Sequence, residues 1–232
     1  MRLSRVLVFG AHHDDEIAMS GTIAALAGQG VRVTIAIMTD GSEGYPDAAM
    51  KDQIVAVRRE EARACDAVLG THRRICLDRP DMALVNDKET FKECLRLIRQ
   101  VRPEIIFTHG PQDRHRDHRA TSEITREAAW QAGEPVSTES GPPWKTPLVL
   151  YYKAVGSPLP AIRFDVTHTA HKRYEALATQ ESQHAVFGKS KGEFLRKAEQ
   201  MRQNPEQQFE TFWIAETNSF EGFDSFFPES SP

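Results

Sequence analysis

The chain has 232 residues, of which 40% are hydrophobic and 27% charged, and its formal net charge is −4. This length suits one large domain, and an acidic chain without clustered Lys and Arg argues against nucleic-acid binding. No apolar stretch approaches the ~18 residues of a membrane span, and the short apolar run near the N-terminus indicates a strand rather than a signal peptide. The three cysteines lack metal-site spacing, which favours free thiols in a reducing compartment. We therefore expect a soluble, cytoplasmic protein.

Apolar, β-branched runs alternate with amphipathic stretches through the first part of the sequence. The runs predict strands, and the stretches carry apolar residues at helical spacing. In chain order we expect a strand at residues 5–10, a helix at 19–28, a strand at 31–38, a helix at 52–69, a strand at 74–77, a helix at 89–101, a strand at 104–108 and a helix at 119–132. Gly70, directly after the second helix, is a typical helix stop.

The last third of the sequence continues with weaker signals. Residues 133–145 are rich in Gly, Pro and Ser, which predicts a loop. Beyond them we expect strands at 147–154 and 162–166 and helices at 169–183 and 189–202, and we expect residues 223–232 to fray. Repeated strand–helix alternation implies a mostly parallel sheet covered by helices on both faces. The fold class is therefore a Rossmann-like α/β single domain over residues 1–222, followed by the tail.

Five consecutive ionisable residues follow the first predicted strand: His12, His13, Asp14, Asp15 and Glu16. A dinucleotide-binding turn would need Gly at these places, and two carboxylates would repel a phosphate. Charge of this density at the end of a buried strand is costly unless something compensates it. The motif therefore argues against a nucleotide site and favours a site for a cation.

A second polar cluster follows the strand expected at residues 104–108. It contains His109, Asp113, His115, Asp117 and His118. Ligands bind open parallel sheets at the carboxyl ends of the strands, so the two clusters would converge if their strands are neighbours. Imidazole and carboxylate suit zinc, whose catalytic sites use three protein ligands and keep one open position. Taken alone, the second cluster also fits a solvated helix N-terminus capped by Asp113 or Asp117.

At these residues the sequence resembles the PIG-L/LmbE-like zinc-dependent N-deacetylases. That family carries A-H-P-D-D-E after its first strand and D-x-H-x-D-H after a later strand. Here residues 11–16 read A-H-H-D-D-E, and residues 113–118 read D-R-H-R-D-H. The S-G-T-I-A run at residues 20–24 and an R-x-x-E…L-G pattern starting at Arg58 also match, so the resemblance covers roughly residues 4 to 185.

The resemblance implies a role for each matching residue. The ligands of one Zn²⁺ per chain would be His12, Asp15 and His118. Asp14 would be the general base, His115 the general acid or oxyanion stabiliser, and Asp117 the residue that orients His115. Substrate contacts would come from Glu43, Arg58 and Asp81. Each of these three also has a plain structural interpretation: turn chemistry for Glu43, a surface ion pair for Arg58, and a post-proline turn or helix cap for Asp81.

The sequence departs from the family pattern at two places. His13 and Arg116 stand where the family usually has Pro. Because adjacent residues of an extended turn project to different sides, we expect His13 to point outward. We expect His109 to bond to nearby backbone rather than to a metal.

The resemblance implies removal of an acetyl group from an N-acetylglucosamine-type conjugate, a small-molecule substrate. The alternatives are a zinc amidase acting on a thiol conjugate or another amide, a non-catalytic sugar- or metal-binding relative, and a phosphoesterase. A phosphoesterase would usually need two metal ions and more basic residues. Assembly into a homo-oligomer stays open, since the sequence shows no clear interface.

Overall fold

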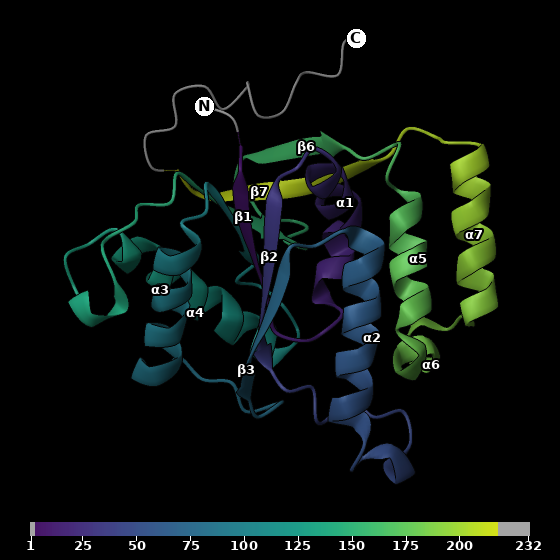
Figure 1. The fold of residues 1–232 in the computed structure, drawn as a ribbon, viewed down its shortest axis with the longest axis horizontal. Helices are drawn as coiled ribbons and strands as arrows, with labels where there is room; N and C mark the ends of the chain where they lie inside the picture. Colours follow the sequence, from purple (N-terminus) through teal and green to yellow (C-terminus); the bar gives the residue numbers. More distant parts are fainter. Residues whose placement is uncertain (1–2, 218–232) are drawn as a thin grey trace.

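A seven-stranded sheet with the order β3-β2-β1-β4-β5-β7-β6 organises residues 3–217, the part of the chain that the computed structural model describes (Figure 1). Neighbouring strands run parallel from β3 through β5, and β7 runs antiparallel to both β5 and β6. The strands are β1 (Arg5–Gly10), β2 (Arg32–Thr39), β3 (Arg73–Arg79), β4 (Ile105–His109), β5 (Leu148–Tyr152), β6 (Ala161–Asp165) and β7 (Phe209–Thr217). The expected α/β fold with a mostly parallel sheet is confirmed.

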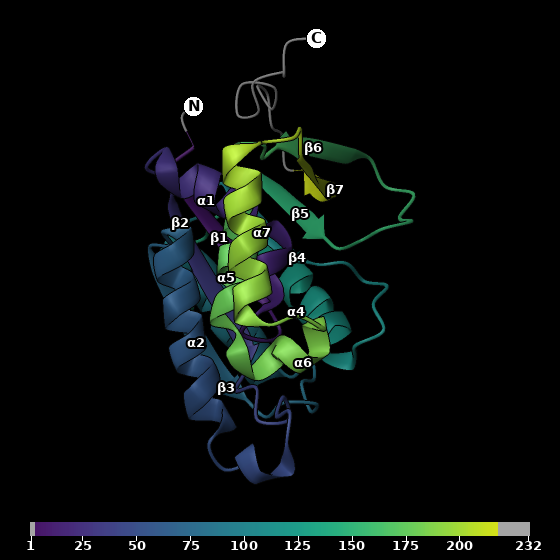
Figure 2. The same cartoon turned by 90° about the vertical axis from the view of Figure 1, so that its right-hand side faces the viewer.

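Helices cover both faces of this sheet, which gives the single domain two apolar cores (Figures 1 and 2). Alternate β1 residues point to opposite faces, so Val8 joins the core beneath α1, α2 and α5, while Phe9 joins the core beneath α3 and α4. The helices are α1 (Ser20–Gly28), α2 (Ile54–Leu69), α3 (Lys88–Val101), α4 (Arg116–Ala132), α5 (His171–Thr179), α6 (His184–Phe187) and α7 (Lys191–Gln203). None in the described part is long and apolar enough to cross a membrane.

Most expected elements lie close to their predicted places, and the differences have local causes. Gly70 ends α2 in the left-handed conformation expected of a helix stop. A short 3-10 helix over Asp15–Met19 precedes α1, and α4 begins at Arg116 instead of residue 119. The single helix expected at 169–183 is divided into α5 and a 3-10 turn at Glu181–Gln183. The earlier start of α4 matters for function, because it places Asp117 and His118 in the first helical turn.

Strand β7 is the one element of the described sheet that the sequence analysis missed. It pairs with β5 and β6, and its Glu210 carboxylate accepts hydrogen bonds from the backbone N–H groups of Gly21 and Thr22, at 2.9 and 2.8 Å. A carboxylate at a helix N-terminus satisfies amides that have no partner within the helix. The C-terminal strand therefore caps α1, close to the turn that follows β1. The tail expected at 223–232 lies outside the described residues.

Candidate metal and catalytic site

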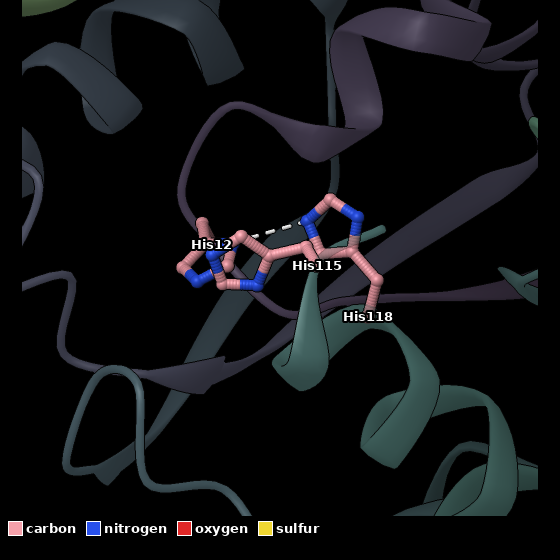
Figure 3. Close-up of side chains that lie close together, drawn as sticks. All are labelled: His12, His115 and His118. Carbon is pink, nitrogen blue, oxygen red and sulfur yellow. Dashed lines mark hydrogen bonds between the residues drawn. The ribbon is translucent and has the colours of Figure 1, made fainter. Parts of the chain in front are cut away.

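The two polar clusters meet at the carboxyl edge of the sheet. Strands β1 and β4 are parallel neighbours, with Val6 opposite Ile105 and Val8 opposite Phe107. The turn after β1 therefore faces the loop after β4, as the sequence analysis expected. Figure 3 shows the result, with His12 on the first turn lying against His115 and His118 at the start of α4.

Three side chains form a compact set of potential metal ligands: His12, Asp15 and His118. His118 Nε2 lies 3.3 Å from both His12 Nδ1 and Asp15 Oδ1, and His12 Nδ1 lies 3.6 Å from Asp15 Oδ2. A tetrahedral zinc ion with bonds of about 2.0–2.2 Å holds its donor atoms about 3.3–3.6 Å apart. The two distances from His118 Nε2 and the donor types therefore fit zinc, while the distance from His12 is to the other carboxylate oxygen of Asp15.

Neighbouring side chains extend this group of donors beyond the three expected ligands. Donor atoms within 4.8 Å of one another form three overlapping groups, each with one or two of the expected ligands: His12 with His115 and His118, Asp15 with His109 and His118, and His12 with Asp81 and Asp117. Only the first group includes the predicted acid His115. The carboxylates of the third group lie behind His12, and their contacts there explain how its ring is oriented.

The surroundings of His12 fix which of its nitrogens faces the other ligands. Its Nε2 lies 3.1 Å from Asp81 Oδ1 and 3.4 Å from Asp117 Oδ2, so the ring directs Nε2–H at these carboxylates and Nδ1 at His118. Burial lowers the pKa of His12, but hydrogen bonds to Asp117, Asp15 and Asp81 outweigh burial and raise it to about 11. A buried imidazole among three carboxylates shows that this pocket favours positive charge. Carboxylates behind a ligating histidine are typical of metal sites.

Asp15 is held from behind in the same way. Its Oδ2 accepts hydrogen bonds from the backbone N–H groups of Ala11 and His12, at 2.9 and 2.8 Å, and lies 3.0 Å from His109 Nε2. Burial opposes ionisation, but His109, His12 and His118 hold the pKa of Asp15 well below its usual range. The expected backbone contact of His109 exists, since its Nε2 lies 3.3 Å from Ala11 N. Sequence reasoning missed its contact with Asp15 and its ring stacking on His118, with centroids 4.0 Å apart.

Asp14 and His115, the expected base and acid, line the same cavity as the ligand set. Asp14 Oδ1 accepts a hydrogen bond from the Arg58 guanidinium at 3.1 Å. His115 precedes α4 as its N-cap, and its Nδ1 accepts the backbone N–H of Asp117 at 3.2 Å. Partial burial, followed by the charges of His12 and His118, lowers the pKa of His115 and favours the neutral ring.

Asp117 contacts the His115 ring through its backbone, while its carboxylate has other partners. Its carboxylate accepts the backbone N–H groups of Met82 and Leu84, at 2.8 and 3.3 Å, and lies against His12. Among the described contacts, Asp117 reaches the His115 ring through its backbone N–H and not through its carboxylate. The side chain therefore supports a predicted metal ligand and the loop after β3.

The three expected substrate-side residues surround the same cavity at different depths. Glu43 is exposed at the rim, whereas Arg58 and Asp81 are buried. The Arg58 guanidinium passes beneath residues 41–44, where a Cβ at Gly44 would collide with it. Asp81 Oδ2 accepts the backbone N–H of Glu43 at 3.1 Å, while Oδ1 contacts His12. Asp81 therefore links the loop after β2 to the ligand set.

The cavity itself has a volume of about 620 Å³, within the range of small-molecule sites. Besides the residues already described, sequence reasoning missed part of its lining. These residues come from the ends of β3 and β5 and from the chain around α6, namely Met82, Lys153, Gln183, Val186 and Phe187. No motif marks them, because they reach the cavity through loop conformation.

The expectation that His13 points outward is wrong. Its side chain is buried, with Nε2 4.0 Å from Cys76 Sγ on β3. Burial and the nearby charges of Arg74, Arg58 and Arg59 lower the pKa of His13 to about 3. The turn therefore packs His13 against the sheet, away from the ligand set. Arg116 is exposed at the first position of α4, where Pro would also be tolerated.

A protein-family model and several curated proteins match this chain. The model of the PIG-L family, described as GlcNAc-PI de-N-acetylase, matches residues 7–129, more than half of the chain. The chain is 34% identical over 138 residues to the diacetylchitobiose deacetylase of Thermococcus kodakarensis, covering 57% of this chain and 52% of that protein. It is 31% identical over 172 residues to the 1D-myo-inositol 2-acetamido-2-deoxy-alpha-D-glucopyranoside deacetylase of Rhodococcus erythropolis, covering 62% of this chain and 58% of that protein. The chain thus spans little more than half the length of these curated relatives.

Solved structures share the fold over nearly the whole chain. The N,N'-diacetylchitobiose deacetylase from Pyrococcus horikoshii is similar with a TM-score of 0.77 and 25% identity, over 91% of this chain and 84% of that chain. GalB, the 4-carboxy-2-hydroxymuconate hydratase from Pseudomonas putida, is similar with a TM-score of 0.76 and 21% identity, over 94% of this chain and 99% of that chain. The second likeness concerns the fold alone, since one fold can carry different reactions.

Proposed function

Because the chain belongs to the PIG-L family of GlcNAc-PI de-N-acetylases, we propose that it is a zinc-dependent hydrolase that removes the acetyl group from an N-acetylglucosamine-type substrate. One observation carries this proposal: Asp14 and His115 line the same cavity as the ligand set of His12, Asp15 and His118. A site that only bound sugar would not need a potential base and a potential acid beside a metal site.

The metal would supply Lewis-acid chemistry, polarising an amide carbonyl and lowering the pKa of water to about 7. His12, Asp15 and His118 would hold one Zn²⁺ per chain. Asp14 would act as general base, because Arg58 holds its Oδ1 at 3.1 Å, and in the described part of the chain its Oδ2 has no hydrogen-bond partner. One carboxylate oxygen is thus positioned while the other can accept a proton.

His115 is suited to donate a hydrogen bond. Its Nδ1 accepts the Asp117 N–H, so the neutral ring carries its proton on Nε2. The lowered pKa favours that neutral form. His115 would therefore stabilise the developing oxyanion by a hydrogen bond from Nε2–H, and Asp14, carrying the proton it took from water, would protonate the departing amine, giving acetate and a free amine.

The curated relatives are named as deacetylases of diacetylchitobiose and of an acetamido-glucopyranosyl inositol, which supports an N-acetylglucosamine unit as the part of the substrate recognised here. Glu43 at the rim can accept hydrogen bonds from sugar hydroxyls. Arg58 and Asp81 would act on substrate through the residues they hold, Asp14 and the loop that carries Glu43. We also propose that the protein works in the cytoplasm.

The first test is acetate release from N-acetylglucosamine and its simple glycosides by the zinc-loaded protein, compared with Asp14→Asn. We expect wild-type activity and a loss on the order of 10²–10⁴ in the variant, with zinc still bound at one per chain. Asp52→Asn, which changes an exposed aspartate outside the cavity, is the matched control and should keep full activity.

Other results would redirect the assignment. Acetate from simple amides but from no glycoside would favour the amidase alternative. Bound zinc with no acetate from any of these compounds would favour a non-catalytic relative. Equal activity of wild type and Asp14→Asn would remove Asp14 from its proposed role.

A further inference from the structure

Three apolar side chains, Met82, Val186 and Phe187, line the cavity, and the proposed chemistry does not use them. Met82 and Val186 line it with 45% and 76% of their surfaces exposed, and Phe187 lies beside Val186 in the short helix α6. Polar residues line the same cavity, among them Glu43 and Gln183, whose side-chain amide donates to Gly44 O at 2.6 Å. Exposed large apolar side chains at a cavity are a typical sign of a ligand surface.

Met82 is held in this position at an energetic cost. Its φ of 62° lies in the left-handed region, which non-glycine residues rarely adopt. Its backbone N–H donates to Asp81 Oδ1 and to Asp117 Oδ2, both at 2.8 Å. These same carboxylates contact His12. Strained residues cluster at functional sites, where the surrounding structure fixes them. The contacts that orient a predicted metal ligand therefore also hold Met82 in the lining of the cavity.

We infer that Met82, Val186 and Phe187 form a subsite for an apolar aglycone, meaning an alkyl or aryl group attached to the anomeric carbon of the N-acetylglucosamine unit. This inference rests on the proposed function and makes it more specific. An inositol or a second sugar would place hydroxyl groups against these three apolar side chains, where they would lose water without gaining hydrogen bonds. An apolar group would instead cover Met82 and Val186, while the sugar hydroxyls face Glu43 and Gln183.

The test compares acetate release from methyl, hexyl and phenyl N-acetylglucosaminides and from diacetylchitobiose, with the zinc-loaded full chain. Each buried methylene favours binding by about fourfold, so we expect kcat/KM for the hexyl glycoside to exceed that for the methyl glycoside by about tenfold or more. The phenyl glycoside should also exceed the methyl glycoside, and diacetylchitobiose should not.

Variants test which residues cause the preference for the hexyl glycoside. Met82→Ser and Val186→Ser should each lower the hexyl-to-methyl ratio of kcat/KM by about threefold or more, because each removes apolar contact area. Leu195→Ser is the matched control, since Leu195 is an exposed apolar residue on α7 outside the cavity, and its ratio should equal that of the wild type. Thermal unfolding of each variant shows whether it is folded.

Three results would overturn the inference, and they differ from one another. Equal kcat/KM for methyl and hexyl glycosides would overturn it while leaving the deacetylase intact, and light scattering would then show whether a second copy of the chain covers Met82 and Val186. A hexyl preference that survives both Met82→Ser and Val186→Ser would overturn the assignment to these residues. No acetate from any glycoside would overturn the proposed function itself, and the inference with it.

Discussion

The turn after β1 has two sides of opposite electrostatic character, although its residues are consecutive. His12 lies among carboxylates that outweigh the effect of burial and raise its pKa to about 11. His13, the next residue, is buried beside Arg74 and Arg58, and burial together with these cations lowers its pKa to about 3. Because both residues are histidines, the charge of their neighbours and not the residue type decides which one can help to bind a cation.

The arginine side of the turn contains the interaction with the largest expected effect on folding. Glu16 is fully buried, and its carboxylate accepts a hydrogen bond from the Arg74 guanidinium at 2.5 Å. Arg74→Met would leave this carboxylate buried without its cation. We expect the free energy of unfolding to fall by about 3–5 kcal/mol, measured by urea denaturation.

The pH dependence of this loss has a defined sign. Burial raises the pKa of Glu16 above that of an unfolded carboxyl group, so the folded state holds this proton more strongly, and stability is lost as pH rises through that range. The deficit of Arg74→Met should therefore be smaller near pH 5 than near pH 8. Arg59→Met, which removes an exposed partner of Asp78, is the control and should cost less than about 1 kcal/mol. A similar loss in both variants would contradict the prediction.

On the carboxylate side, Asp81→Asn tests whether the Asp81 carboxylate supports His12 as a metal ligand. The amide can still accept the backbone N–H of Met82, but it removes the negative charge beside His12 Nε2. We expect zinc affinity to fall about 10–100-fold, measured by competition with a chromophoric chelator. Asp78→Asn changes an exposed carboxylate near the end of β3, the strand before Asp81, and should bind zinc as the wild type does. Unchanged affinity in Asp81→Asn would show that His12 does not depend on this carboxylate.

His13→Leu should have the smallest effect of these changes. The side chain is buried against Cys76 and, in the described structure, its Nδ1 has no hydrogen-bond partner, so an apolar residue of similar size replaces mainly packing. We expect zinc stoichiometry and affinity to be unchanged and the free energy of unfolding to change by less than about 1.5 kcal/mol. Loss of zinc in this variant would place His13 in the metal site after all.

Much of the fold and the centre of the site could be predicted from sequence because their signals are local. The buried apolar run of β1, the stop at Gly70 and the clusters after β1 and β4 each depend on adjacent residues. The direction of His13 could not be predicted, because it depends on where β3 and its neighbouring arginines lie after folding. The position of Met82 depends on a left-handed backbone that distant carboxylates hold in place.

Strand β7 was missed for a related reason. Phe209–Thr217 carries charged residues at Glu210 and Glu216, which weakens its apolar pattern. The carboxylate of Glu210 has its partners at Gly21 and Thr22, and a contact across the whole domain leaves no signal in the local sequence.

The cap that Glu210 provides for α1 can form only late in the synthesis of the chain. The hydrogen bond from Gly21 to Glu210 joins residues 189 positions apart. A chain synthesised as far as His118 already contains all residues proposed to bind zinc. Helix α1, which follows the turn with His12 and Asp15, acquires its carboxylate cap only when β7 has been synthesised. Contacts of such long range form late, because the intervening chain must first lose its freedom. We therefore expect a nascent chain shorter than about 209 residues to capture the metal less firmly than the released protein, since β5 would lack its antiparallel neighbour and α1 its cap.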